Sequence, residues 1–316
     1  MTFLPFLDTL WFSLATTLPI LFWLAAGLVL RRTDKISDAF IKDANYLVFT
    51  WCLPVLLFIN IGQTSIVSVW QADFLGFAAL FVLLSIPLLW WLARWLVHDP
   101  SARGVFVQGA YRGNMNVVGL AMVVNAFGAS AVPLASVFMA VMTLLFNITA
   151  VAVLQAGQGV SLQRQAKQSL TNPIILGVFA GILWSLTGWP LPPMTDATLQ
   201  GLADLALPIA LLCIGASLRW ESLNSNRRVV LWASFFKLIA LPWLAVAIAV
   251  LMGFRDEPLG ILFLMMAAPT AAASYVMAKA MTNWGDMAAE IIVVSTLLTL
   301  VTTTVGVFIL RSLSLI

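Results

Sequence analysis

The chain has 316 residues, of which 62% are hydrophobic and only 9% are charged, with a formal net charge of +3. A soluble domain is closer to about half apolar and about one quarter charged, so this composition excludes a water-soluble fold and points to the lipid bilayer as solvent. The apolar runs are continuous and about 20 residues long, which predicts membrane-spanning helices rather than the alternating strands of a barrel.

The predicted elements are ten membrane-spanning helices with short connections, which make the chain an all-α integral membrane protein. In chain order, the spans are expected at residues 10–30, 40–61, 73–97, 104–126, 132–155, 170–188, 199–218, 229–252, 258–280 and 287–310. No Lys or Arg precedes the first apolar run, so we interpret the span 10–30 as a retained helix and not as a cleaved signal peptide.

The placement of basic residues predicts the orientation of these spans. The connections on one side of the membrane hold eleven basic residues in or beside them: Arg31, Arg32, Lys35, Lys42, Arg94, Arg103, Arg164, Lys167, Arg219, Arg227 and Arg228. The opposite side holds two, Arg255 and Arg311. Because basic residues gather on the cytoplasmic side, we expect both termini outside.

An internal repeat relates the two halves of the chain. A shift of 154 residues places Pro19-Ile20 on Pro173-Ile174 and Leu53-Pro54 on Leu207-Pro208, and nearly the same shift relates later spans. Each copy holds five spans, and because five is odd the two copies must insert in opposite orientations. Such an inverted repeat is typical of alternating-access transporters.

The repeat also defines the domain organisation. We expect a first five-helix repeat at residues 1–155, a cytoplasmic linker at 156–169, and a second, inverted five-helix repeat at 170–316. The connection 156–169 is the longest in the chain, and no soluble domain or low-complexity segment interrupts the pattern.

Matching stretches of the two halves carry helix-breaking and polar residues where apolar ones are expected. The shift of 154 residues lays residues 112–116 over residues 266–270, and the residues concerned are Gly113, Asn114, Asn116, Pro269 and Thr270. Glycine loosens a helix and proline removes a backbone donor, so we expect two discontinuous helices near the middle of the bilayer. The positive ends of their half-helices would attract an anion, for which the amides offer hydrogen bonds. We therefore expect Gly113, Asn114, Asn116 and Thr270 to bind the substrate, and Gly119 and Pro269 to shape the breaks. The alternative is that the amides only join helices and the proline only kinks one.

Several motifs in a fixed order resemble those of the auxin efflux carrier family. They are Gly113-Asn114 followed by Val118-Gly119-Leu120, then Asn172-Pro173-Ile174-Ile175-Leu176-Gly177, Leu207-Pro208, Gly215-Ala216-Ser217-Leu218 and Ala267-Ala268-Pro269. The resemblance covers essentially the whole chain. It implies two inverted five-helix halves, broken helices at 104–126 and 258–280 that cross at the substrate site, a homodimer, and an organic-anion substrate such as malonate or auxin. The chain lacks the long central loop of many plant members, so it resembles a bacterial-type protein of the inner membrane.

The chain departs from the family motif at one position. The motif usually carries proline after Gly-Leu, and this sequence has Ala121 there. Either Gly113 and Gly119 suffice to break the span 104–126, or the crossing is less symmetric here than the resemblance implies. The crossover proline remains only in the second half, as Pro269.

Charged residues inside the spans are costly and are often functional. Arg112 lies beside the two amides and either pairs with a carboxylate substrate or extends to the cytoplasmic surface. Asp204 precedes Pro208 and either carries H⁺ or binds Na⁺, or it lies near the outer surface. Lys237 lies about 13 Å along its span from Arg228, so we expect it to need an internal partner.

These features predict a secondary transporter of a small organic anion that works by alternating access. Export is expected, because an inside-negative potential favours outward movement of negative charge. The alternative is a symporter or antiporter coupled to Na⁺ or H⁺ on a related inverted-repeat fold, with Asp204 as the ion-coupling residue. An intramembrane enzyme is disfavoured, since the chain has one histidine and no His-Glu-x-x-His signature. We expect no cofactor, metal or nucleic-acid partner.

Overall fold

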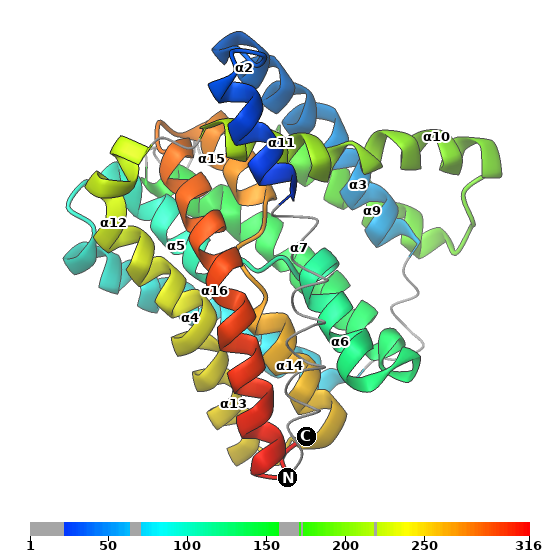
Figure 1. Cartoon of the computed structure of the whole chain (residues 1–316). Coiled ribbons are helices and arrows are strands. Elements are labelled where there is room, and N and C mark those ends of the chain that lie inside the picture. Colours follow the sequence, from blue (N-terminus) through cyan, green and yellow to red (C-terminus); the bar gives the residue numbers. More distant parts are fainter. Residues whose placement is uncertain (1–21, 64–70, 158–170, 172, 218–219) are drawn as a thin grey trace.

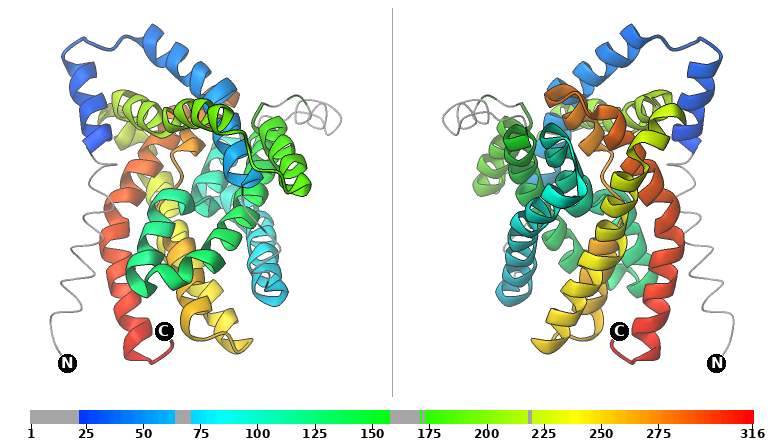
Figure 2. Two further views of the ribbon diagram at one scale, coloured as in Figure 1. Left: turned by 90° about the vertical axis from the view of Figure 1, so that its right-hand side faces the viewer. Right: turned by 90° about the vertical axis from the view of Figure 1, so that its left-hand side faces the viewer.

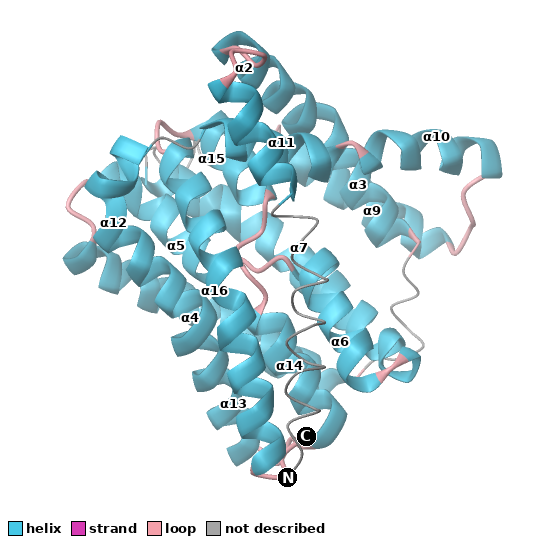
Figure 3. Cartoon of the chain, viewed as in Figure 1, coloured by secondary structure: helices cyan, strands magenta, loops and turns pink. Residues whose placement is uncertain are grey.

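The computed structural model describes residues 22–63, 71–157, 171, 173–217 and 220–316. Among these residues every regular element is helical, which confirms the all-α prediction (Figures 1 and 3). Residues 22–32 are helical, and the elements that follow are α2 (Asp38–Leu47), η1 (Val48–Cys52), α3 (Leu53–Gly62), α4 (Ala72–Leu96), η3 (Pro100–Ala102), α5 (Arg103–Tyr111), η4 (Met115–Gly119), α6 (Leu120–Phe127), η5 (Ala129–Ala131), α7 (Val132–Gly157), α9 (Pro173–Thr187), α10 (Pro193–Asp204), α11 (Ala206–Ser217), α12 (Trp220–Phe235), η6 (Phe236–Ala240), α13 (Leu241–Leu251), α14 (Asp256–Ala267), α15 (Ala273–Met281) and α16 (Gly285–Ser312).

Local sequence explains where several of these helices begin and bend. Ser37 caps α2 by accepting a hydrogen bond from the Phe40 amide. The Asp99 carboxylate accepts hydrogen bonds from the Ser101 amide and hydroxyl, and both bonds hold its pKa below the ordinary value. The π-helical turn η1 comes directly before Leu53-Pro54, and η6 comes directly before Leu241-Pro242. Because proline cannot donate a backbone hydrogen bond, such turns let the helix continue past it.

Five of the described helical stretches are long and apolar enough to cross a membrane. They are Asp38–Ile59, Ala72–Leu96, Leu134–Ala156, Pro193–Ala216 and Asn226–Leu251. A sixth is reached if Gly285–Thr299 and Val301–Ser312, which meet at a bend of 43°, form one span. These positions agree with the predicted spans.

The remaining four predicted spans do not appear as single helices of this length among the described residues. The span 10–30 lies mostly outside the described residues, and 170–188 contains the 15-residue helix α9. The spans 104–126 and 258–280 are each interrupted near the middle, so that none of their pieces reaches the length of a membrane-spanning helix. The ten-helix inverted repeat therefore stays a prediction.

The helices form two groups that differ in direction. Helices α10 and α11 run across one end of the molecule, whereas α4, α13, α14 and α16 extend away from them toward the other end (Figures 1 and 2). Helix α3 packs along α9, and the helix at residues 22–32 crosses α11. A side chain added at Gly27 would overlap the Leu212 carbonyl, and one added at Gly215 would overlap the Leu24 carbonyl. Such small residues let helices approach closely within lipid.

Candidate functional site

The two interrupted spans cross, and their breaks pair with each other. The first break separates α5 from η4, and the second separates α14 from α15. The Asn114 amide donates to the Pro269 carbonyl at 2.7 Å, and the Ala271 amide donates to the Arg112 carbonyl at 3.1 Å. Gly113 and Thr270 thus form an isolated antiparallel bridge. The expected interruptions of the helices at 104–126 and 258–280 are present in the structure, while their equivalence in an inverted repeat and their depth in the bilayer stay predictions.

The pairing explains how two helix breaks persist inside an apolar membrane protein. An unsatisfied backbone group in hydrocarbon costs several kcal/mol, and each break frees amides and carbonyls from its own helix. Here Arg112 and Ala268 take extended conformations, so that each break supplies the partner of the other. Pro269 has no amide to lose, and only its carbonyl takes part. The first break contains no proline, and Gly113 occupies its centre.

Gly119 and Thr270 hold the crossing together through packing and hydrogen bonding. A side chain added at Gly119 would lie 2.8 Å from the Met265 sulfur, so a larger residue there would require the Met265 side chain to move. The buried Thr270 hydroxyl donates to the Gly109 carbonyl at 2.8 Å, and the Thr270 amide donates to the Ser295 hydroxyl at 3.1 Å. The hydroxyl of Thr270 is therefore bound within the protein.

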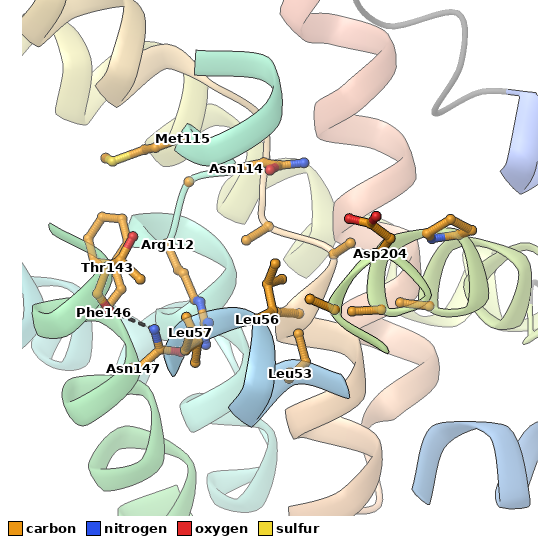
Figure 4. Close-up of a pocket in the computed structure, with 18 residues that line it drawn as sticks. Leu53, Leu56, Leu57, Arg112, Asn114, Met115, Thr143, Phe146, Asn147 and Asp204 are labelled. Carbon is orange, nitrogen blue, oxygen red and sulfur yellow. Dashed lines mark hydrogen bonds between the residues drawn. The ribbon is translucent and has the colours of Figure 1, made fainter. Parts of the chain in front are cut away.

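A cavity of about 410 Å³ lies against this crossing (Figure 4). Its lining residues are Leu53, Leu56, Leu57, Arg112, Gly113, Asn114, Met115, Thr143, Phe146, Asn147, Ala203, Asp204, Ala206, Pro208, Ala210, Ala271, Ala272 and Ala273. The volume suits a small organic molecule. Both second half-helices begin at this wall, one at Met115 and the other at Ala273. Their free amides and dipoles give this wall a positive character.

Arg112 supplies the main charge of the cavity. It is buried, with 5% of its surface exposed. One guanidinium nitrogen donates to the Asn147 amide oxygen at 2.7 Å and another donates to the Met277 sulfur at 2.6 Å. No acidic side chain of the described residues forms an ion pair with Arg112. A guanidinium carries five donors, so Arg112 can still bind a carboxylate.

Asn114 lies on the same wall of the cavity. Its backbone is fully used, because the carbonyl accepts from the Val118 and Gly119 amides while its own amide bonds Pro269. Its side-chain amide forms no hydrogen bond with any other described residue and lines the cavity. An amide with this freedom can donate to a ligand oxygen. Asn116 lies in η4, and its side chain is outside the described set.

Asp204 also lines the cavity, from the end of α10 (Figure 4). Its carboxylate accepts a hydrogen bond from the Gln200 amide at 3.0 Å and is exposed. The structure therefore brings together four of the predicted candidates, Arg112, Gly113, Asn114 and Asp204. Gly119, Pro269 and Thr270 do not line this cavity.

The sequence interpretation missed Asn147 and Thr143 of α7. Figure 4 shows Asn147 beside Arg112. The Asn147 side-chain nitrogen donates to the Thr143 carbonyl at 2.6 Å, which turns its oxygen toward Arg112. The available signal was an amide in the middle of an otherwise apolar span, the same signal that singled out Asn114.

Comparisons with known proteins add an independent result. A family model described as "Membrane transport protein" matches residues 12–307. A protein of Rhizobium meliloti (strain 1021), named "Putative malonate transporter", is 26% identical over 299 residues, covering 90% of this chain and 91% of that protein. A protein of Methanothermobacter thermautotrophicus, named "Uncharacterized transporter", is 22% identical over 302 residues, covering 92% and 95% of the two chains.

Proposed function

We propose that this multi-pass membrane transporter moves a small organic anion through the cavity beside the helix crossing. The chain belongs to the membrane transport protein family, and its motifs are those of the auxin efflux carriers. A small carboxylate such as malonate is the first substrate to test, since one relative carries that name. Transport is by alternating access and, in the direction of export, is driven by the membrane potential.

One observation carries the proposal: Arg112 is a buried cation in a cavity wall. Its guanidinium has N–H donors that form no hydrogen bond with the described residues, and it has no acidic partner among them. A buried charge is stable only when it is paired and hydrogen-bonded. Asn147 orients the guanidinium, and Asn114 offers a further donor. An anionic substrate would complete this set of partners.

The reciprocal contacts between the two halves support an alternating-access mechanism. The helix at residues 22–32 contacts α11, and α3 contacts α9. A shift of 154 residues carries the helix at 22–32 onto α9 and carries α3 onto α11. The two contacts are therefore equivalent in the two halves, as a pseudo-twofold axis requires. In this proposal the repeats 1–155 and 170–316 insert in opposite orientations in the inner membrane with both termini outside, and the paired breaks move as one unit.

A thermal-stability measurement tests the substrate class. The purified protein is heated with small monocarboxylates, dicarboxylates and indole acids, with Na⁺ or with choline as the counter-ion. A ligand that binds only the folded protein raises its stability by about 2.7 kcal/mol when present at about 100 times its Kd. We expect malonate or another small carboxylate to raise the Tm, and we expect a smaller rise in the Asn114→Ala variant.

Asn283→Ala is the matched control for Asn114→Ala, because Asn283 is an exposed asparagine outside the cavity lining. Its Tm shift with the same anion should equal that of the wild type. If no anion stabilises the wild type, the proposed substrate class is wrong. If the shift survives in Asn114→Ala, the anion binds without the Asn114 amide.

A second function is favoured by the position of Asp204 in the same cavity. A carboxylate beside the substrate could bind Na⁺ or carry H⁺, which would make the protein a coupled symporter or antiporter. The two functions predict opposite results for Asp204→Asn. Under the potential-driven proposal, the variant binds the anion at least as tightly as the wild type, because a like charge has left the cavity.

Transport of the stabilising anion by Asp204→Asn proteoliposomes distinguishes these outcomes. Activity equal to that of the wild type supports the uncoupled mechanism. A variant that remains folded and binds the anion, yet transports none, would establish the coupled function instead.

A further inference from the structure

A second buried cation lies behind the cavity wall. Lys237 belongs to the π-helical turn η6, and only 1% of its surface is exposed. It does not line the cavity, and the proposed anion site does not use it. Burying an ammonium group is costly, so its position calls for a physical explanation.

Lys237 lies between the end of α14 and the first break of the crossing. Its Nζ donates to the Met266 carbonyl at 2.5 Å. A side chain added at Gly113 would lie 3.0 Å from the same nitrogen. No acidic side chain in the described part of the chain forms an ion pair with Lys237. The ammonium group is therefore bound by a backbone carbonyl at the end of α14, beside Gly113 of the first break.

The end of α14 is suited to a cation. Met266 lies in the last turn of this helix, which ends at Ala267, one residue before the extended break. The final carbonyls of a helix lack intrahelical partners and carry a partial negative charge. In transporters with discontinuous helices, the carbonyl ends of half-helices and the unwound backbone coordinate the coupling cation. Hard cations such as Na⁺ seek the same oxygen ligands.

We propose that Lys237 is a built-in cation that takes the place of a coupling Na⁺ at the carbonyl end of α14, so that the crossing is complete and the transporter works without Na⁺. This inference rests on the proposed transport function for its meaning, but its main test does not need a substrate. It also separates the roles of the two buried cations: Arg112 binds the anion, whereas Lys237 neutralises the helix end.

The test compares the Tm of the full-length protein in NaCl and in choline chloride, without any organic anion. The wild type is expected to show equal Tm values in the two salts, because Lys237 fills the site. Lys237→Ala removes the ammonium group and leaves its space beside the Met266 carbonyl. In this variant Na⁺ should bind and raise the Tm by about 3 °C relative to choline. Lys42→Ala, which truncates an exposed lysine, should behave as the wild type.

A malonate titration of the same proteins connects the inference to transport. In Lys237→Ala, Na⁺ should strengthen malonate binding about tenfold, a coupling of ordinary size. Lys237→Met fills the space with an uncharged side chain, so it should bind malonate more weakly than the wild type in either salt. This variant keeps the inference testable if Lys237→Ala does not fold.

Three results would overturn the inference. They are a Na⁺-dependent Tm in the wild type, a folded Lys237→Ala that Na⁺ does not stabilise, and a Lys237→Met that matches the wild type in both Tm and malonate binding. Failure of the proposed function has a different signature, because then no anion stabilises the wild type. The Tm of Lys237→Ala in NaCl and in choline chloride would still show whether Na⁺ binds at the end of α14.

Discussion

Replacing Arg112 by methionine is expected to weaken binding of the transported anion by at least about 30-fold, because losing one partner of a buried, hydrogen-bonded charge pair costs about 2–5 kcal/mol. The structure gives this residue no acidic partner within the described chain, so the anion itself would be that partner. Methionine keeps a long apolar side chain in a buried position, so the variant should remain folded.

Isothermal titration or anion-dependent thermal stability measures this effect. Arg112→Lys should fall between the wild type and Arg112→Met, because lysine keeps the charge but cannot present the planar fork of donors. Arg94→Met is the matched control, since Arg94 is an exposed arginine near the end of α4, and it should bind the anion as the wild type does. Unchanged binding by a folded Arg112→Met would remove the anion site from this cavity.

A purely structural role for Arg112 makes a different prediction. The guanidinium also satisfies the Asn147 oxygen, so its loss leaves a buried acceptor unpaired at a cost of about 1–3 kcal/mol. If Arg112 served only to join α7 to the crossing, Arg112→Met would lower the Tm without anion but would keep the full anion-dependent shift. Loss of the shift itself identifies a binding role.

The sequence was sufficient to predict the helix breaks because their causes are local. Pro269 cannot donate a backbone hydrogen bond, and a glycine between polar residues destabilises a helix in any surroundings. The breaks at Gly113 and Pro269 follow from these residues alone. That the freed backbone meets protein follows in turn, because backbone groups in lipid need a partner, whereas the position of Arg112 at a cavity was one of two alternatives.

The partners of these residues were not predictable, because they come from distant parts of the chain. No local pattern shows that Asn147 orients Arg112, that Thr270 bonds Gly109, or that Lys237 reaches the end of α14. In an apolar helix nearly every face is equally hydrophobic, so periodicity does not tell which face meets which neighbour. We expected Thr270 among the substrate-binding residues, and in the structure its hydroxyl donates to the Gly109 carbonyl of α5.

The membrane potential is expected to have the largest effect on transport. Each net negative charge that crosses the membrane gains about 2.3 kcal/mol per 100 mV, which corresponds to about 50-fold in the equilibrium concentration ratio. An exporter of an organic anion that couples to no ion therefore needs no other energy source. A transporter that moved Na⁺ or H⁺ together with the anion in electroneutral amounts would not respond to the potential.

Efflux of radiolabelled malonate from proteoliposomes, under a potential set by K⁺ and valinomycin, measures this most directly. With the interior negative, we expect efflux that is faster than at zero potential, independent of Na⁺, and lost in Arg112→Met. Malonate efflux that stays the same at both potentials, or that Arg112→Met supports as well as the wild type, would contradict potential-driven anion export through the cavity at the helix crossing.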